Sequence, residues 1–259
     1  MMLFTSRDRL HLMTVFAAAV SLSSCLRHPT VIASPTSVAA LVAKHVDAIG
    51  GQANLAAIQS IQAVGILDER GTLHPMFTDR RRPNLLRVRM IHGGDLIFTE
   101  VYTGTRSWEG PPGKENCRPD SAAMSATRHA ADQFEDPLLA ALAHAASARL
   151  MGRTTIGARD LYQIDVTQRD STRASYYIDA QTFMLSRVRN QRPLHPTEPS
   201  KLIELVLDDF RPVSGVLFPF RGIERDVESG EPLTTYLSLW VEANVPISGN
   251  PYALPQSCG

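Results

Sequence analysis

The chain has few cysteines, and their spacing marks neither a metal-bound nor a disulfide-stapled small fold. Three cysteines occur among 259 residues, and no two form a C-x-x-C pair, which argues against a zinc ribbon or a thioredoxin-like motif. The eight histidines are scattered, and none forms H-x-H or H-E-x-x-H, so the sequence shows no metal motif. The length is sufficient for a sizeable hydrophobic core that needs no staple.

Neither sign of charge is in excess, because 26 basic residues balance 26 acidic ones. A nucleic-acid partner, which would select for a basic surface, is therefore not expected. The motifs G-x-S-x-G, P-loop and G-x-G-x-x-G are also missing, so we assign no catalytic residue and no cofactor, and we expect a protein that is not an enzyme. A Ser-His-Asp triad can assemble from distant positions, which leaves an enzyme as the third hypothesis.

The longest apolar run, Leu10–Leu22, is shorter than the roughly 20 residues that a membrane-spanning helix needs. It follows a short start that contains Arg7 and Arg9, which is the order of a secretory signal peptide. The run ends in Leu22-Ser23-Ser24-Cys25, which resembles the bacterial lipobox. We therefore expect residues 1–24 to be removed and Cys25 to be acylated, with two or three acyl chains holding the protein on a membrane.

Three alternatives to lipidation remain open. The apolar run could stay as an uncleaved anchor, although its length argues against this. Ordinary cleavage near Ala33 would discard Cys25, and in a disordered leader Cys25 would have no role. Residues 25–36 form a tether in the lipidated form, and residues 37–259 form the domain that carries the function.

The domain is expected to start with helices. Ser37 can cap a helix over Val38–Ile49 with apolar residues at i, i+3 and i+4 spacing, and Gly50-Gly51 stops it. A short helical turn follows at Ala53–Gln59. A second helical block is expected over Ser125–Ala146, where Asp136 caps the piece that begins with Pro137.

The remaining segments alternate apolar and polar residues with period two, which is typical of half-buried antiparallel strands. We expect four strands before the helical block and six to seven after it. The clearest strand segments are Ile61–Leu67, Leu86–Met90, Leu96–Tyr102, Arg106–Trp108, Tyr162–Val166, Tyr176–Ile178, Leu185–Arg189, Ile203–Leu207 and Leu237–Val241.

This order of elements, together with several short sequence motifs, resembles that of the LolA/LolB-like carriers, the outer-membrane lipoprotein-sorting proteins. The resemblance runs from about Val38 to Ile247. The phrases that carry it are Ala48-Ile49-Gly50-Gly51, Arg82-Pro83-Asn84-Leu85, Tyr102-Thr103-Gly104 running on to Trp108, Tyr177-Ile178-Asp179, the segment Asp209–Pro219 and the closing segment Glu242–Ile247.

The resemblance implies an α+β fold: a curved antiparallel sheet, an unclosed half-barrel, with helices covering its concave side. A cavity between sheet and helices would bind or transfer a hydrophobic ligand such as a lipid, an acyl chain or a lipoprotein anchor. A solidly packed interior is the alternative, because alternation reports only burial. The alternative function is a structural lipoprotein that binds an envelope protein.

The resemblance also implies a location and partners. The protein would face the periplasm of the cell envelope, held by its lipid anchor. Because Leu26 rather than Asp follows Cys25, similarity to enterobacterial sorting points to the outer membrane. The expected partners are the hydrophobic ligand, the membrane and other envelope lipoproteins.

Arg82 is the site residue that the resemblance singles out. In the carriers, the arginine of the Arg-Pro-Asn-Leu phrase hydrogen-bonds the backbone of the lid. Arg80 and Arg81 precede it here, so Arg82 could instead be one of three solvated charges. The other expected residues of the cavity and lid, each of which could equally belong to a packed core, are Leu86, Val88, Trp108, Leu138, Leu139, Leu142 and Phe218.

Cys117 and Cys258 remain once Cys25 is lipidated. The periplasm is oxidising, so this pair can form a disulfide that ties the tail to the loop after Trp108. Two free thiols are the alternative, since the sequence does not report the distance between them.

Overall fold

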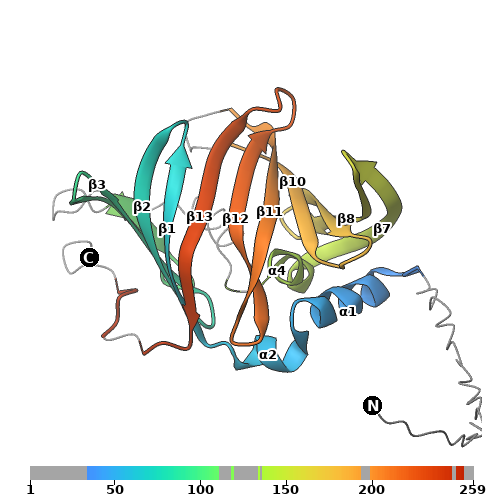
Figure 1. Cartoon of the computed structure of the whole chain (residues 1–259), viewed down its shortest axis with the longest axis horizontal. Helices are drawn as coiled ribbons and strands as arrows, with labels where there is room; N and C mark the ends of the chain where they lie inside the picture. The colour runs from blue at the N-terminus through green and yellow to red at the C-terminus, as the bar shows by residue number, and fades with distance from the viewer. Residues whose placement is uncertain are drawn as a thin grey trace, which may run out of the picture. The chain divides into compact units, whose positions relative to one another are not determined.

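The computed structural model describes residues 34–110, 118–119, 134, 136–193, 199–246 and 249–253 (Figure 1). Residues Pro35–Gly259 cluster into one compact unit. Helix α1 spans Val38–Ala48, and the side chain of Ser37 accepts a hydrogen bond from the Ala40 amide at 3.1 Å, as the capping signal predicts. In the described part of the chain, no helix is long and apolar enough to cross a membrane.

Two further helices are short in the described part of the chain. Helix α2 spans Gly51–Ala57 and follows α1 directly, while α4 spans Pro137–Ala143. The turn between α1 and α2 requires glycine at position 50. Gly50 has φ of 125°, and a Cβ there would lie 2.2 Å from the carbonyl oxygen of Gly215. The glycine that ends the first helix therefore also allows the turn after it to approach the turn at Gly215 closely.

The described strands form one antiparallel sheet of thirteen strands, in the order β6-β5-β4-β3-β2-β1-β13-β12-β11-β10-β9-β8-β7. The strands are β1 Ser60–Glu69, β2 Thr72–Arg81, β3 Leu85–His92, β4 Asp95–Tyr102, β5 Ser107–Gly110, β6 Arg118–Pro119, β7 Ala145–Ile156, β8 Arg159–Gln168, β9 Arg173–Asp179, β10 Leu185–Arg192, β11 Lys201–Val213, β12 Val216–Asp226 and β13 Pro232–Ala243. Since β6 and β7 lie at opposite edges, the sheet does not close on itself. The expected fold class, a curved and unclosed antiparallel sheet with helices, is confirmed.

Two sequential meanders meet where β1 pairs with β13, so the first and last strands of the domain lie side by side in the middle of the sheet. The register runs from Ile61 opposite Ala243 to Glu69 opposite Thr234, with an irregularity at Val64/Gly65. Gly65 allows the close approach there, because a Cβ would lie 2.5 Å from the carbonyl oxygen of Leu237.

The helices cover one face of the sheet, called the inner face below. On β7–β11 this face packs against α1 and α4 in the main core cluster, which includes the fully buried Leu41, Leu138, Ile164 and Ile178. A second cluster joins Ile58 at the end of α2 to the start of β1 and β12. Alternate residues of the same strands point to the outer face.

Two boundaries differ from the sequence expectation. Strand β2 was not expected, because Pro75 and a polar run obscure its alternation, but pairing with β1 and β3 on both sides selects the extended state. The second helical block was expected to reach Ala146, yet α4 ends at Ala143 and β7 begins at Ala145. Alanine favours helix locally, and the pairing of β7 with β8 overrides this preference. Most of the segment Ser125–Phe134 lies outside the described residues.

Candidate functional site

A pocket of about 320 Å³ lies between the short helices and the turn that follows β2. Its lining combines apolar surface from Leu55, Ala56 and Leu139 with hydrogen-bonding groups from α2, the segment that follows it and the turn. The polar lining residues are Gln52, Gln59 and Arg82. This volume lies at the lower end of the range for small-molecule sites, and the mixed lining suits an amphipathic ligand.

Arg82 holds the carboxyl end of α2. Its Nε donates to the carbonyl oxygen of Ile58 at 2.8 Å, and a terminal nitrogen donates to that of Leu55 at 3.2 Å. Its own amide donates to the carbonyl of Gln59 at 3.0 Å. The last carbonyls of a helix have no partner within the helix and carry partial negative charge, so a guanidinium is well matched to them. The Arg82–Pro83 peptide bond is cis.

An aromatic ring covers the other side of this guanidinium. The Cζ atom of Arg82 lies 4.8 Å from the centroid of the Phe134 ring, and the Phe134 amide donates to the side chain of Asn84 at 3.0 Å. Phe134 is buried with Ile58 and Ile61, and Phe218 packs against this cluster. Arg82 and Phe218, which are far apart in the sequence, therefore both contact one apolar cluster, although Phe218 does not line the pocket.

Leu86 and Val88 lie elsewhere on the inner face, in the middle of the β1–β5 half of the sheet. Leu86 is fully buried and pairs with Tyr102, while Val88 is half-buried and pairs with Glu100. These two positions are on the same face as the pocket, although they do not line it.

The three leucines that were predicted to belong to the lid lie on different faces of α4. Leu138 is fully buried in the main core, and Leu142 packs against that core from its edge. Leu139 points to the other side and lines the pocket. The contact with the pocket therefore falls to Leu139.

Trp108 does not belong with the expected cavity residues. It pairs with Val101, which pairs with Arg87, so all three occupy the outer face opposite Leu86. There Trp108 packs with Val101 and Tyr252, a residue of the C-terminal tail. The core-anchor alternative for this tryptophan holds, because strand alternation places it away from the helices.

The three cysteines lie outside the described residues, so the lipidation of Cys25 and a bridge between Cys117 and Cys258 stay predictions. The contact of Tyr252 with Trp108 brings the tail and β5 together. In the sequence, Cys117 follows β5 and Cys258 follows Tyr252. The bridge stays a prediction, which mass spectrometry with and without reductant tests.

Sequence reasoning missed a buried ion pair that joins both helices of the main core. His45 is fully buried on α1. Its Nδ1 lies 2.8 Å from the carbonyl oxygen of Phe183, and its Nε2 lies 3.2 Å from the Oδ1 of Asp136, which also caps α4. The Nδ1 atom is hydrogen-bonded to the Phe183 carbonyl, and the Nε2 atom lies within ion-pair distance of the Asp136 carboxylate. A neighbouring carboxylate favours the charged form of the ring, the imidazolium.

The charge state follows from these contacts. Burial lowers the pKa of His45, but the contacts with Asp136 and the Phe183 carbonyl outweigh it, so the pKa rises above 6.5. Burial, followed by the charge of Asp136, raises the pKa of the neighbouring Tyr176 to about 12, so that this phenol stays neutral. The pair ties α1 to α4 beside the pocket.

We expect the stability of the domain to fall as the pH rises through the raised pKa of His45. A raised folded-state pKa contributes stability that is complete below the unfolded value of 6.5 and is lost above the folded value. Urea unfolding at a series of pH values from 6 to 9 measures this loss. The variant His45→Gln, which cannot titrate, should lack this dependence, and an equal slope in both proteins would contradict the assignment.

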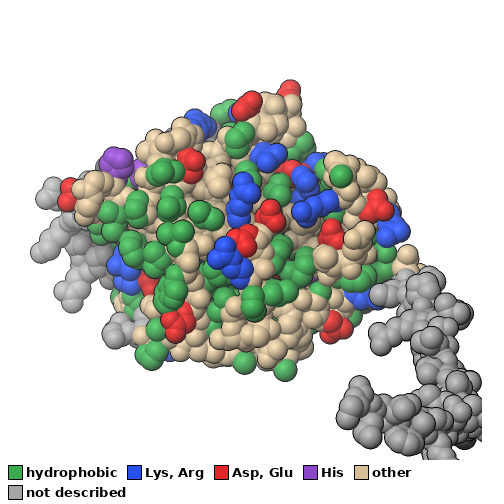
Figure 2. Space-filling view, in the orientation of Figure 1, with side chains coloured by type: hydrophobic (Ala, Val, Ile, Leu, Met, Phe, Trp, Pro, Cys, Tyr) green, Lys and Arg blue, Asp and Glu red, His purple; other side chains and the backbone are tan. Residues whose placement is uncertain are grey.

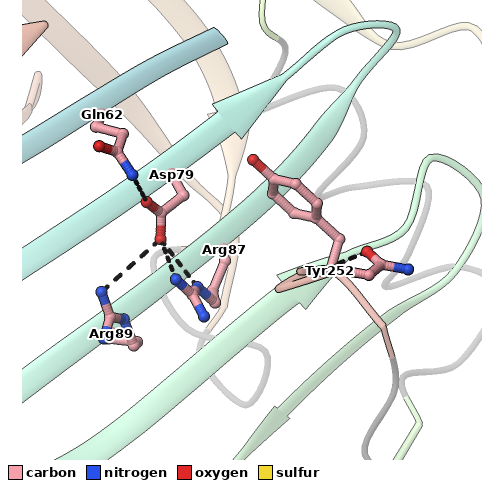
Figure 3. Close-up of polar contacts among 6 residues, drawn as sticks. Gln62, Asp79, Arg87, Arg89 and Tyr252 are labelled. Carbon is pink, nitrogen blue, oxygen red and sulfur yellow. Dashed lines mark hydrogen bonds and ion pairs between the residues drawn. The ribbon is translucent and has the colours of Figure 1, made fainter. Parts of the chain in front are cut away.

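The outer face carries a second charged network (Figure 3). Asp79 is 4% exposed; its carboxylate accepts from Gln62 at 2.9 Å and from the guanidinium of Arg87 at 2.9 and 2.6 Å. Arg89 lies 3.8 Å away, and the ring of Tyr252 comes from the tail beside these strands. Burial, followed by the charge of Asp79, raises the pKa of Tyr252 to about 12. This network lies beside Tyr252 of the tail and away from the pocket.

The fold is similar to that of several solved protein structures. No family model matches the sequence, and no curated protein matches it. A solved LolA superfamily protein from Nitrosomonas europaea matches 82% of this chain and 96% of its own, with 12% identity and a TM-score of 0.56. A DUF1329 family protein from Desulfovibrio piger matches 83% and 97%, with 12% identity and a TM-score of 0.55.

A third solved structure agrees with these two. It is a putative outer membrane lipoprotein-sorting protein domain from Vibrio parahaemolyticus, which matches 77% of this chain and 92% of its own, with 9% identity and a TM-score of 0.53. At such identities the likeness concerns the fold, and it agrees with the resemblance carried by the Arg82–Leu85 and Asp209–Pro219 phrases. The chain folds as a LolA-like half-barrel.

Proposed function

We propose that the protein is an envelope lipoprotein that binds or transfers a hydrophobic ligand in the pocket between α2, α4 and the Arg82 turn. The observation that carries this proposal is a pocket of mixed apolar and polar lining beside an arginine that is bonded to the helix forming one wall. A lipid, an acyl chain or a lipoprotein anchor fits the mixed lining. The LolA-like fold supports the same class of ligand.

Arg82 gives the pocket two states in this proposal. When α2 moves away, the guanidinium loses the carbonyls of Leu55 and Ile58 and must find water or a ligand oxygen instead. Hydrogen bonds to a charged group contribute about 1.5–3 kcal/mol, which biases α2 toward the closed position without locking it. A ligand head group with a free oxygen can take over the same donors.

Replacing Arg82 with leucine should leave the fold intact and speed the exchange of a bound fluorescent fatty acid by about 10-fold, because the closed position loses the hydrogen bonds that favour it. Arg81→Leu is the matched control, since Arg81 is the adjacent arginine and its side chain is exposed. Displacement kinetics on the full chain measure both variants. If the chain binds no hydrophobic probe, the ligand proposal is wrong. If both variants exchange the bound fatty acid at the same rate, the pocket can still bind a ligand, but the role assigned to Arg82 is wrong.

We further propose that acylated Cys25 holds the domain on the outer membrane, facing the periplasm, through residues 25–36. The support is the order of basic start, apolar run and Leu22-Ser23-Ser24-Cys25. Such a tether would keep the pocket near the leaflet that supplies or receives the ligand. A membrane-held protein of this fold resembles the acceptor side of a carrier system.

Cys25→Ser should abolish labelling by a fatty-acid analogue and release the protein from the membrane fraction, because each buried CH₂ of the acyl chains contributes about 0.8 kcal/mol. Metabolic labelling followed by fractionation is the measurement. Ser24→Ala, which keeps a small residue before the cysteine, should label normally. Unchanged labelling of Cys25→Ser would exclude this anchor.

One observation favours the alternative function, an interaction lipoprotein. On β13 the outer face leaves large apolar side chains in solvent: Leu237 is 37% exposed, Leu239 57% and Trp240 43%. Figure 2 shows hydrophobic side chains gathered on this face beside a charged region. Exposed aromatic and aliphatic clusters of this kind are typical of protein interfaces. A photo-crosslinker at position 239 that captures a single envelope protein in stoichiometric yield would favour this function, and a wild-type level of complex in Trp240→Ser would argue against it.

A further inference from the structure

The hairpin of β2 and β3 contains two short sequence motifs in which histidine and methionine occur in opposite order. Strand β2 contains His74-Pro75-Met76, and β3 contains Met90-Ile91-His92. Met76 and Met90 are direct cross-strand partners. The rings of His74 and His92 follow next to them, with centroids 5.4 Å apart and planes tilted by 52°.

The four side chains share one face. Residues two apart on a strand point the same way, so each histidine lies beside a methionine on the inner face. Direct cross-strand partners have Cβ atoms about 5 Å apart, and diagonal neighbours about 7–8 Å apart. Two imidazoles and two thioethers on long side chains can therefore converge on a single atom between the strands.

One of these nitrogens lacks the partner that a buried polar atom requires. The Nδ1 of His74 is buried, and in the described part of the chain no hydrogen-bond partner faces it. Buried polar atoms are nearly always paired, so this one needs an explanation. His92 is exposed where β3 enters the Gly93-Gly94 turn, and this leaves a path from solvent.

We propose that these four residues form a binding site for Cu(I). Thioethers are soft ligands that select Cu(I), and imidazole binds copper readily. A set of this kind offers no carboxylate oxygen, which harder ions prefer. A search for metal ligands of the types His, Cys, Asp and Glu does not detect such a site, because methionine is not among them. In the described residues, no three residues of those four types are placed to bind one metal ion. The bound ion would also satisfy the orphaned nitrogen of His74.

This site is separate from the pocket. Arg82 follows the end of β2, whereas His74 lies near its start, so the two sites occupy opposite ends of the β2–β3 hairpin. Failure of copper binding would leave the ligand proposal untouched, and the reverse also holds.

The test is an anaerobic titration of the full chain with Cu(I) against a chromogenic Cu(I) chelator, after alkylation of the cysteine thiols. We expect one Cu(I) per chain that survives alkylation, and an X-ray absorption spectrum with both nitrogen and sulfur neighbours. His74→Phe and the near-isosteric Met76→Leu should each weaken binding by about 100-fold, since even changes behind the ligands cost roughly 10- to 100-fold. Met151→Leu is the control, because Met151 is exposed on the distant strand β7.

Three results would overturn the proposal. Binding that disappears on alkylation would assign copper to the thiols. Equal affinities of wild type, Met76→Leu and Met151→Leu would exclude the hairpin. A spectrum without sulfur neighbours would exclude the methionines. The Met76→Leu exchange conserves volume closely enough to keep the fold, which thermal unfolding of each variant checks.

Discussion

Replacing Asp136 with alanine is expected to lower the free energy of unfolding by about 3–5 kcal/mol, the cost typical of breaking a buried ion pair from one side. The change removes the partner of His45, whose side chain is fully buried, and the cap of α4, where Asp136 accepts from the amides of Leu138 and Leu139 at 2.9 and 3.2 Å. The imidazole cannot reach water, so its charge would stay uncompensated or be lost. Urea unfolding at pH 6 measures the effect.

The same variant should reverse the pH dependence near neutrality. Without Asp136, burial is the largest influence left on His45, and it lowers the pKa. A base with a lowered folded-state pKa costs stability as the pH falls below its unfolded value, about 6.5, which is opposite to the wild type.

Two variants separate the parts of this prediction. Asp136→Asn keeps a capping side chain but removes the charge, so it should fall between the wild type and Asp136→Ala. Asp47→Ala removes an exposed carboxylate from α1 and should change the stability by less than about 0.5 kcal/mol. If Asp136→Ala were as stable as Asp47→Ala, the buried pair would not hold the helices.

Replacing Asp79 with alanine is expected to destabilise the domain by about 3 kcal/mol, because it removes a buried acceptor and leaves two half-buried donors without it. Its carboxylate joins Gln62 of β1 to Arg87 of β3 across β2, and the Arg87 side chain is 24% exposed. Tyr252 lies beside this network (Figure 3), so the loss should also loosen the tail. Urea unfolding reports the first effect, and hydrogen exchange at residues 249–253 reports the second.

The matched control for Asp79 is Asp95, an exposed acid at the start of β4. Asp95→Ala should be nearly neutral, whereas Asp79→Asn should lie between the two because an amide can still accept one hydrogen bond. Rapid exchange of the tail in Asp95→Ala as well would show that Asp79 does not fasten it.

The local features of the domain could be predicted from the sequence. Ser37 and Asp136 each accept hydrogen bonds from amides in the first turn of the helix that follows, so this interaction depends only on neighbouring residues. Both cap the helices as predicted. Period-two alternation identified most strands, because it reports which residues are buried on a half-covered sheet. The Arg82–Leu85 phrase pointed to the arginine that bonds the carboxyl end of α2.

The contacts between distant segments could not be predicted from the sequence and follow from the folded structure. The pairing of β1 with β13, the ion pair of His45 with Asp136 and the approach of His74 to His92 join residues whose separation in sequence carries no signal. The face of a residue was equally undetermined: register placed Trp108 outside and Leu139 at the pocket. Alternation fixes which residues share a face, and only the packing of the helices selects which face encloses the site, because that choice depends on contacts far along the chain.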